Sequence, residues 1–132
     1  MAWMFIDTHE RQTFRYGWLD VGASSRLSPR AHVGRAQHVI RLIARDRHLL
    51  SHASGIVVVA GPGSFSSIRM GVLTANLLAR LLHKPLVGIS VEEAGDLPKL
   101  ARRLSKKSFP TASYVAPVYD AEPNITSPRL LP

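Results

Sequence analysis

The sequence predicts an α/β fold: a mixed sheet of about five strands on which two main helices pack. Residues 55–60 (GIVVVA) are apolar throughout, which is typical of a central strand with parallel neighbours. Residues 66–83 are apolar on nearly every side of a helix, which is typical of a helix buried on two sides. Residues 13–21 are rich in aromatic and β-branched side chains, so strands come first and then alternate with helices.

Two strands are predicted at the start of the chain. The apolar run at residues 3–6 ends at Asp7, which indicates a buried strand with a carboxylate at its carboxyl end. Residues 13–21 are expected to pair with it through a polar turn, because their aromatic side chains share one face (Phe14, Tyr16 and Trp18). A weaker signal for a third strand lies at residues 23–27 within a loop-like segment.

The spacing of apolar residues then changes, and it predicts a first helix over residues 31–50. Its apolar stripe recurs at helical spacing (Val33, Ala36, Val39, Ile40, Leu42 and Ile43). The arginines lie elsewhere around the helix, which makes it basic and amphipathic. A second helix over residues 66–83 and a short buried strand over residues 85–89 follow.

The last part of the chain is predicted to contain one more short helix and a tail. Ser90 is placed to cap a turn, and Asp96 is placed to cap a helical piece that reaches residue 106. Pro98 fits the first turn of that helix. We therefore divide the chain into a lobe (1–107), which ends in this short basic helix, and a Pro-rich tail (108–132).

Composition narrows the classes of function. The 132 residues carry 17 Lys and Arg against 9 Asp and Glu, a formal net charge of +8, which favours an acidic partner or nucleic acid. The absence of cysteine excludes disulfides, thiolate nucleophiles and cysteine-based zinc sites. No apolar run approaches the ~20 residues needed to cross a bilayer, and no basic region precedes the apolar start. We expect a cytoplasmic protein without a membrane segment or signal peptide.

The clearest motif is a glycine loop between the 55–60 strand and the second helix. Gly61, Gly63 and Ser64 lie where free amides and a helix dipole bind phosphates in other proteins. The loop is neither a Walker A sequence nor a Rossmann fingerprint. The alternative is a tight structural turn with Ser64 as the helix cap.

Two further groups are weaker candidates for chemistry. Asp7 fits a metal ligand or a group that orients a phosphate-bound water, and it equally fits an ordinary turn aspartate. His48 and His52 have the spacing of a helical metal pair, but the sequence places no third ligand beside them. We therefore expect no catalytic constellation, no metal and no cofactor.

The first predicted helix is strongly basic. Its arginines could contact the phosphates of tRNA, and a solvated basic face is an equally good interpretation (Arg30, Arg41 and Arg45). The second predicted helix has more apolar surface than a small sheet covers from one side. This excess indicates that another chain covers the remainder, which favours a binding role.

Residues 55–90 resemble the characteristic stretch of the TsaB (YeaZ) family. The matching positions are Gly61, Pro62, Gly63, Ser64, Phe65, Arg69 and Gly71, followed by Gly88 and Ser90. The opening residues 5–8 (FIDT) are similar to the family's first strand, and His32 lies near the histidine that opens its first helix. The resemblance covers about residues 3–92. Ser66 and Ser67 replace the family's Thr-Gly.

This resemblance implies a single lobe of the actin-like ATPase (ribonuclease H-like) type. Family members have two lobes, so most of the second lobe is expected to be missing here. Residues 117–126 resemble the tail that ends many members, which suggests a minimal functional form. TsaB proteins are non-catalytic partners in the synthesis of threonylcarbamoyladenosine at position 37 of tRNA.

The resemblance also implies partners and an interface. TsaB proteins pair with the catalytic subunit TsaD through the two helices of the first lobe, form homodimers through the same helices, and are joined by the ATPase TsaE. Carried onto this chain, the interface comprises Val33, Ala36, Ile40, Ile43, Ile68, Val72, Ala75, Leu78 and Leu82. Gly61, Gly63, Ser64 and Arg69 then form a structural loop or a nucleotide contact shared with the partner. The alternative function is a basic, homodimeric RNA-binding module outside the modification pathway.

Overall fold

The computed structural model describes residues 2–21 and 28–120 and contains a five-stranded mixed sheet. The strands lie in the order β3-β2-β1-β4-β5. The strand bounds are β1 Ala2–Asp7, β2 Thr13–Asp20, β3 Arg30–Val33, β4 Ala53–Gly61 and β5 Leu86–Ser90. Pairing is antiparallel from β1 through β2 to β3, and parallel from β1 through β4 to β5. The predicted α/β class and mixed sheet are confirmed.

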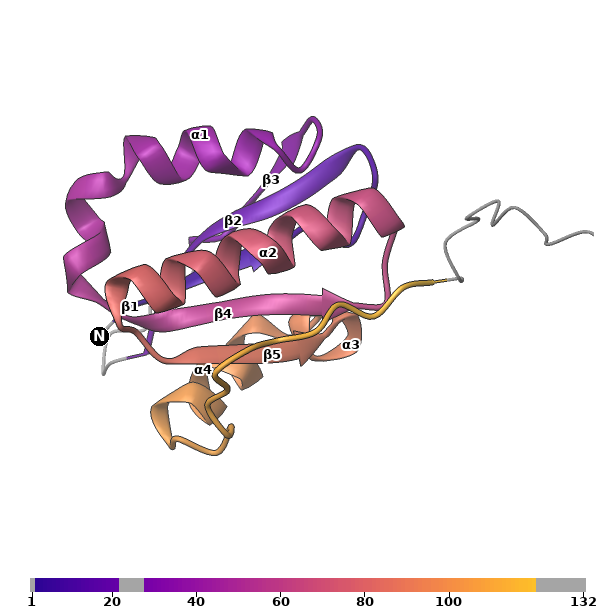
Figure 1. Cartoon of the computed structure of the whole chain (residues 1–132). Coiled ribbons are helices and arrows are strands. Elements are labelled where there is room, and N and C mark those ends of the chain that lie inside the picture. The colour runs from indigo at the N-terminus through magenta and orange to yellow at the C-terminus, as the bar shows by residue number, and fades with distance from the viewer. Residues whose placement is uncertain (1, 22–27, 121–132) are drawn as a thin grey trace, which may run out of the picture.

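Helices cover both faces of this sheet (Figure 1). On one face lie α1 (His38–Arg45) and α2 (Phe65–Leu82), and on the other lie the short α3 (Val91–Ala94) and α4 (Leu97–Ser105). The buried residues accordingly form two hydrophobic clusters, one under each helical layer. The four consecutive side chains at 56–59 of β4 alternate between the two clusters, which is why this strand is apolar throughout. The prediction of a central parallel strand is confirmed.

The helix predicted over residues 31–50 is wrong at both ends. Arg30–Val33 form β3, an edge strand that pairs with β2 and stacks His32 on Phe14. Gly34 then turns the chain with φ at +143°, a conformation that favours glycine and that no helix contains. The helix is only α1, and a 3₁₀ segment, η1 (Arg47–His52), leads into β4. The third strand predicted at residues 23–27 lies outside the described residues.

The caps predicted for the later helices are confirmed. The Ser90 side chain accepts a hydrogen bond from the Glu93 amide, and the Glu93 carboxylate accepts one from the Ser90 amide, which completes a capping box for α3. Hydrogen bonds from Ser90 and Arg103, which outweigh burial, hold the pKa of Glu93 below its usual range. The Asp96 carboxylate accepts a hydrogen bond from the Lys99 amide at the start of α4. These contacts position α4 against the sheet face opposite α1 and α2.

The segment after α4 packs back onto the lobe. We call residues 112–120 the strap; it runs beside β5 to the glycine loop (Figure 1). The Asn76 side chain of α2 pairs with both the N–H and the C=O of Val115, at 2.8 and 2.9 Å. The Val118 amide donates to the Ala60 carbonyl at 2.7 Å, and Tyr119 contacts the Phe65 ring. The first part of the predicted tail therefore belongs to the packed structure.

Candidate functional site

The outer face of α2 carries a row of exposed leucines. Leu73, Leu77 and Leu81 are 51%, 54% and 73% exposed, and their four-residue spacing aligns them along one side of the helix. We call these three residues the leucine ridge. The opposite side of α2 is buried on the sheet through small and branched residues (Ile68, Gly71, Val72, Ala75 and Ala79). The sheet therefore buries only one side of an almost entirely apolar helix, and the leucine ridge on the other side stays exposed to solvent.

The glycine loop is filled by neighbouring backbone. The Gly63 amide donates to the Val118 carbonyl at 3.2 Å, and the Ser64 amide donates to the His9 carbonyl at 3.0 Å. Gly61 has φ at +124°, and a Cβ there would overlap the Val118 carbonyl oxygen. Ser64 occupies the N-cap position of α2, but its side chain makes no capping hydrogen bond. Two amides that could hold a phosphate are thus already paired within the chain.

The Asp7 carboxylate at the end of β1 is also fully engaged. One oxygen accepts hydrogen bonds from Arg15 at 2.8 and 3.0 Å, and the other lies 2.6 Å from Nδ1 of His9. Asp7 is buried, so both partners hold it in a fixed orientation. Within residues 2–21 and 28–120, no group of three His, Cys, Asp or Glu side chains is arranged to hold a metal.

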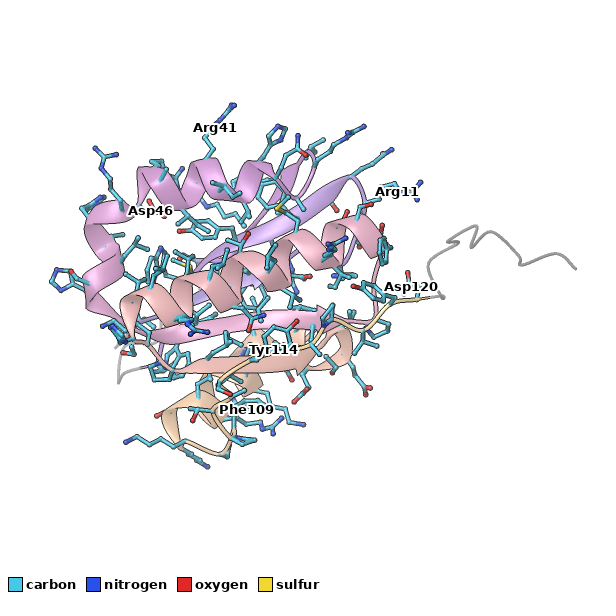
Figure 2. All side chains as sticks on the ribbon, in the orientation of Figure 1. Arg11, Arg41, Asp46, Phe109, Tyr114 and Asp120 are labelled. Carbon is cyan, nitrogen blue, oxygen red and sulfur yellow. The ribbon has the colours of Figure 1, made fainter. Side chains whose placement is uncertain are left out.

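The predicted phosphate-contacting arginines lie on two separate elements. Arg41 and Arg45 are exposed on α1, and Figure 2 shows Arg41 pointing away from the sheet. Arg30 lies on β3, so it does not share the helix face that was predicted for it. A neighbouring cavity of about 430 Å³ lies between the β1–β2 turn, the start of α1 and the start of α2, and its lining includes Arg11 and Arg35. Two cationic side chains, Arg11 and Arg35, therefore line this cavity.

A buried polar cluster fixes α1 on β2. The Asp46 carboxylate, directly after α1, accepts hydrogen bonds from the Tyr16 hydroxyl at 2.9 Å and from Nε1 of Trp18 at 3.3 Å. Burial and the Asp46 carboxylate raise the pKa of Tyr16 well above its usual range. Burial alone would raise the pKa of Asp46, but hydrogen bonds from Arg45, Tyr16 and Trp18 bring it below its usual value. This cluster sets the position of α1 beside α2.

Comparison with known proteins assigns the family. The profile of the TsaD family, described as tRNA N6-adenosine threonylcarbamoyltransferase, matches residues 22–118. The chain belongs to the TsaD family. TsaD-type proteins of similar sequence include that of Methylorubrum extorquens (strain PA1), 35% identical over 86 residues that cover 64% of this chain and 25% of the relative. The protein of Methylobacterium nodulans is 36% identical over 80 residues, which are 58% of this chain and 22% of that protein.

The solved structure of YeaZ from Pseudomonas aeruginosa shares the fold of this chain. Its TM-score is 0.56 at 23% sequence identity, over 68% of this chain and 45% of YeaZ. The chain spans about a quarter of the length of the curated TsaD relatives, since the match covers 25% of the first of them. Within residues 2–21 and 28–120, no helix is both long and apolar enough to cross a membrane.

The residues that the resemblance to TsaB predicts for the interface differ in their exposure to solvent. Ile68, Val72 and Ala75 are buried beneath α2, and Ala36 and Ile43 are buried beside α1. Leu78 and Leu82 are half-buried, whereas Ile40 is half-exposed on the outer side of α1. Val33 is 91% exposed, but it lies on β3 and not on the helix predicted for it.

The leucine ridge is the feature that the predicted interface set left out. In an almost uniformly apolar helix, apolar residues occur on nearly every side. Their pattern therefore does not show which side faces the sheet. The small residues Gly71, Ala75 and Ala79 hold that information, because only small side chains let a helix approach a strand closely. Of the predicted loop residues, Gly61 and Gly63 pack against the strap and His9, while Arg69 is exposed on α2.

Proposed function

We propose that this chain is a non-catalytic, TsaB-type subunit that docks on a TsaD-type catalytic subunit. In this role it supports N6-threonylcarbamoylation of adenosine 37 in tRNA, in the cytoplasm, where a TsaE-type ATPase would join the pair. The observation that supports the proposal is the exposed leucine ridge on α2, in a chain that belongs to the TsaD family and shares the fold of YeaZ.

The ridge has the form of a helix–helix contact. Residues spaced by four along α2 make a continuous ridge, which packs into the groove of a facing helix. Each leucine is about half exposed or more, so covering it contributes on the order of 1 kcal/mol from apolar burial. Ile40 on α1 extends the apolar surface beside the ridge. A pair of helices on the partner would cover both α1 and α2.

The catalytic step is assigned to the partner. The Asp7 carboxylate is held by Arg15 and His9, and the Gly63 and Ser64 amides are bound by backbone carbonyls. These groups, which would be the first candidates to touch a reacting phosphate or carbonyl, stabilise the lobe instead. The outer side of α1 and α2, by contrast, is accessible to a partner.

Light scattering coupled to size-exclusion chromatography tests the proposal. The chain and TsaD from the same organism are purified separately, mixed and measured. We expect a stable complex whose mass exceeds that of TsaD alone by one 14.5 kDa chain. A chain that elutes unchanged beside TsaD at micromolar concentration would contradict the proposal.

The substitution Leu77→Asp tests whether the leucine ridge is the surface that binds TsaD. A carboxylate at the centre of a covered apolar ridge costs several kcal/mol of binding, so the complex should disappear. Because Leu77 is 54% exposed, the free variant should fold with a melting temperature close to that of the wild type. Val33→Asp is the control: it also puts a carboxylate in place of an exposed apolar side chain, but on β3 instead of α2, and it should bind TsaD normally.

A second candidate function, RNA binding by the chain alone, is favoured by the arginine-lined cavity and by Arg41 on α1. It predicts strong tRNA binding without TsaD that weakens steeply with salt, since each phosphate contact releases counterions. Fluorescence anisotropy with labelled tRNA measures this. Arg41→Ala should then reduce the salt slope by about one, whereas Lys106→Ala beyond α4 should not. Binding that does not respond to salt would exclude this candidate.

A further inference from the structure

The charged residues next to the leucine ridge are both arginines. Arg69 precedes Leu73 by four residues, and Arg80 follows Leu77 by three, so both project on the outer side of α2 beside the ridge. Both side chains are exposed. At 100° per residue, the two arginines fall on the same flank of the ridge, the flank that faces the strap rather than α1. We call Arg69 and Arg80 the arginine edge.

The two helices offer these arginines no carboxylate. Neither α1 nor α2 contains an Asp or Glu, and α1 adds Arg41 and Arg45 to the same outer surface. The acidic residue that directly follows α1, Asp46, is buried and accepts hydrogen bonds from Tyr16, Trp18 and Arg45. The outer sides of α1 and α2, which we call the docking face, therefore combine apolar side chains with arginines, and the carboxylate of Asp120 lies outside this face, on the strap beside the start of α2.

We infer that this face selects a partner whose apolar groove is flanked by carboxylates, and that the arginine edge opposes pairing with a second copy of the chain. The inference rests on the proposed docking function and specifies the chemistry of the partner. Opposite charges at the rim of an interface steer encounter and fix its register, whereas apposed like charges disfavour the wrong complex.

Symmetry explains why a second copy fits poorly. In a twofold dimer the same surface meets itself, so every charge on the face meets a face of the same sign. Antiparallel packing of two α2 helices brings Arg69 of each copy near Arg80 of the other. Parallel packing turns the arginine edge toward the basic α1 of the other copy. Since α1 and α2 hold no carboxylate, neither arrangement pairs these arginines with a carboxylate on the helices of the other copy.

The two equilibria should respond to salt in opposite directions. Between roughly 50 and 500 mM NaCl, screening should weaken binding to TsaD and should strengthen any self-association. Calorimetry measures the first equilibrium, and sedimentation velocity of the chain alone measures the second. A dimer of the chain alone that is stable at low salt and dissociates as salt rises would overturn the inference.

Charge reversal tests the arginine edge itself. The double variant R69E/R80E should bind TsaD about tenfold to a hundredfold more weakly than the wild type. The control R102E/K106E changes the net charge equally on and just after α4, on the opposite sheet face, and should stay within about twofold of the wild type. An equal loss in both variants would show that total charge, not the arginine edge, controls binding, and would overturn the inference.

The Leu77→Asp variant separates this inference from the proposed function. If Leu77→Asp abolishes binding while R69E/R80E binds as the wild type does, the docking face stands and the selection by charge is wrong. If Leu77→Asp binds fully, the docking face itself is wrong, and the inference falls with it.

Discussion

Replacing Asn76 by alanine should release the strap from α2. The Asn76 amide nitrogen donates to the Val115 carbonyl at 2.9 Å and to the Val72 carbonyl at 2.8 Å, and its oxygen accepts from the Val115 amide at 2.8 Å. Each of the two bonds to Val115 contributes about 1 kcal/mol. Val115 is buried, so leaving its N–H and C=O unpaired costs about 1–3 kcal/mol per group.

If the strap detaches, water pairs with the Val115 N–H and C=O, and the cost of leaving them unpaired is avoided. The expected loss of stability therefore lies between the loss of the two hydrogen bonds alone and that loss plus the full penalty for the unpaired groups. We expect Asn76→Ala to lower the free energy of unfolding by about 2–3 kcal/mol, after a gain of a few tenths from the better helix former. Urea titration followed by circular dichroism measures the loss. Hydrogen exchange at the Val115 amide shows whether the strap opens, because a detached strap loses its protection.

Arg80→Ala is the matched control for this prediction. This variant also puts alanine in place of a polar side chain of α2, but at an exposed position. It should change the free energy of unfolding by less than about 0.5 kcal/mol. If Asn76→Ala behaves as this control does, and the Val115 amide stays protected, then packing of Val115 and Tyr119 holds the strap and the hydrogen-bond argument is refuted.

Two more predictions concern polar groups that position the helices. The pKa of Asp46 in the folded state lies below its ordinary value of 3.8, so the ionised carboxylate stabilises the fold above that value, and this stabilisation is lost as the pH falls. Asp46→Asn should flatten the fall of the urea midpoint with pH below the ordinary value of 3.8, and an unchanged slope would show that Asp46 does not contribute. Asp96→Ala removes the cap of α4 and should cost about 1 kcal/mol in thermal unfolding; Asp96→Ser should recover most of it, and a loss in both variants alike would point away from capping.

The elements that the sequence predicts well are those whose signal is local. The uniformly apolar β4 and the long apolar α2 lie within two residues of their predicted bounds. The caps at Ser90 and Asp96 follow from side-chain chemistry at fixed spacing. The family likeness carried by the loop motif is also confirmed by the comparisons.

The first helix was mispredicted because the competing signal is not local. Residues 30–33 can alternate as a strand or continue a helical stripe, and Val33 fits both patterns. The outcome depends on the open edge of β2, which offers unpaired backbone groups to whichever segment reaches it. A helix predicted from the apolar spacing alone, without the edge of β2, therefore begins too early in the chain. Gly34, with its positive φ, marks the break.

The proposed docking face was only partly predictable for a related reason. Sequence periodicity places apolar residues on α2 but does not say how much of the helix the sheet covers. That extent is set by tertiary packing: α1 and the strap lie on either side of α2 (Figure 1). The leucine ridge on the outer side of α2 stays exposed. Ile68, Val72 and Ala75, which were predicted for the interface, are buried in the core because they face the sheet.

The motif that carries the family likeness and the face that is proposed to carry function are therefore separable by mutation. Gly71 belongs to the motif, and a Cβ there would overlap the hydroxyl of buried Thr8, which donates to the Ser67 carbonyl at 2.7 Å. Gly71→Ala should therefore lower the free energy of unfolding by about 1–3 kcal/mol, by forcing α2 away from the end of β1. Well below its melting temperature, the variant should still bind TsaD as the wild type does.

Leu77→Asp should show the reverse pattern, with normal stability and lost binding, because its side chain meets solvent in the free chain. Thermal melts and calorimetry on the same preparations give both quantities for each variant. If Gly71→Ala loses binding while still fully folded, the loop region itself contacts the partner. The motif would then be part of the interface, and the assignment of the docking face to the leucine ridge alone would be wrong.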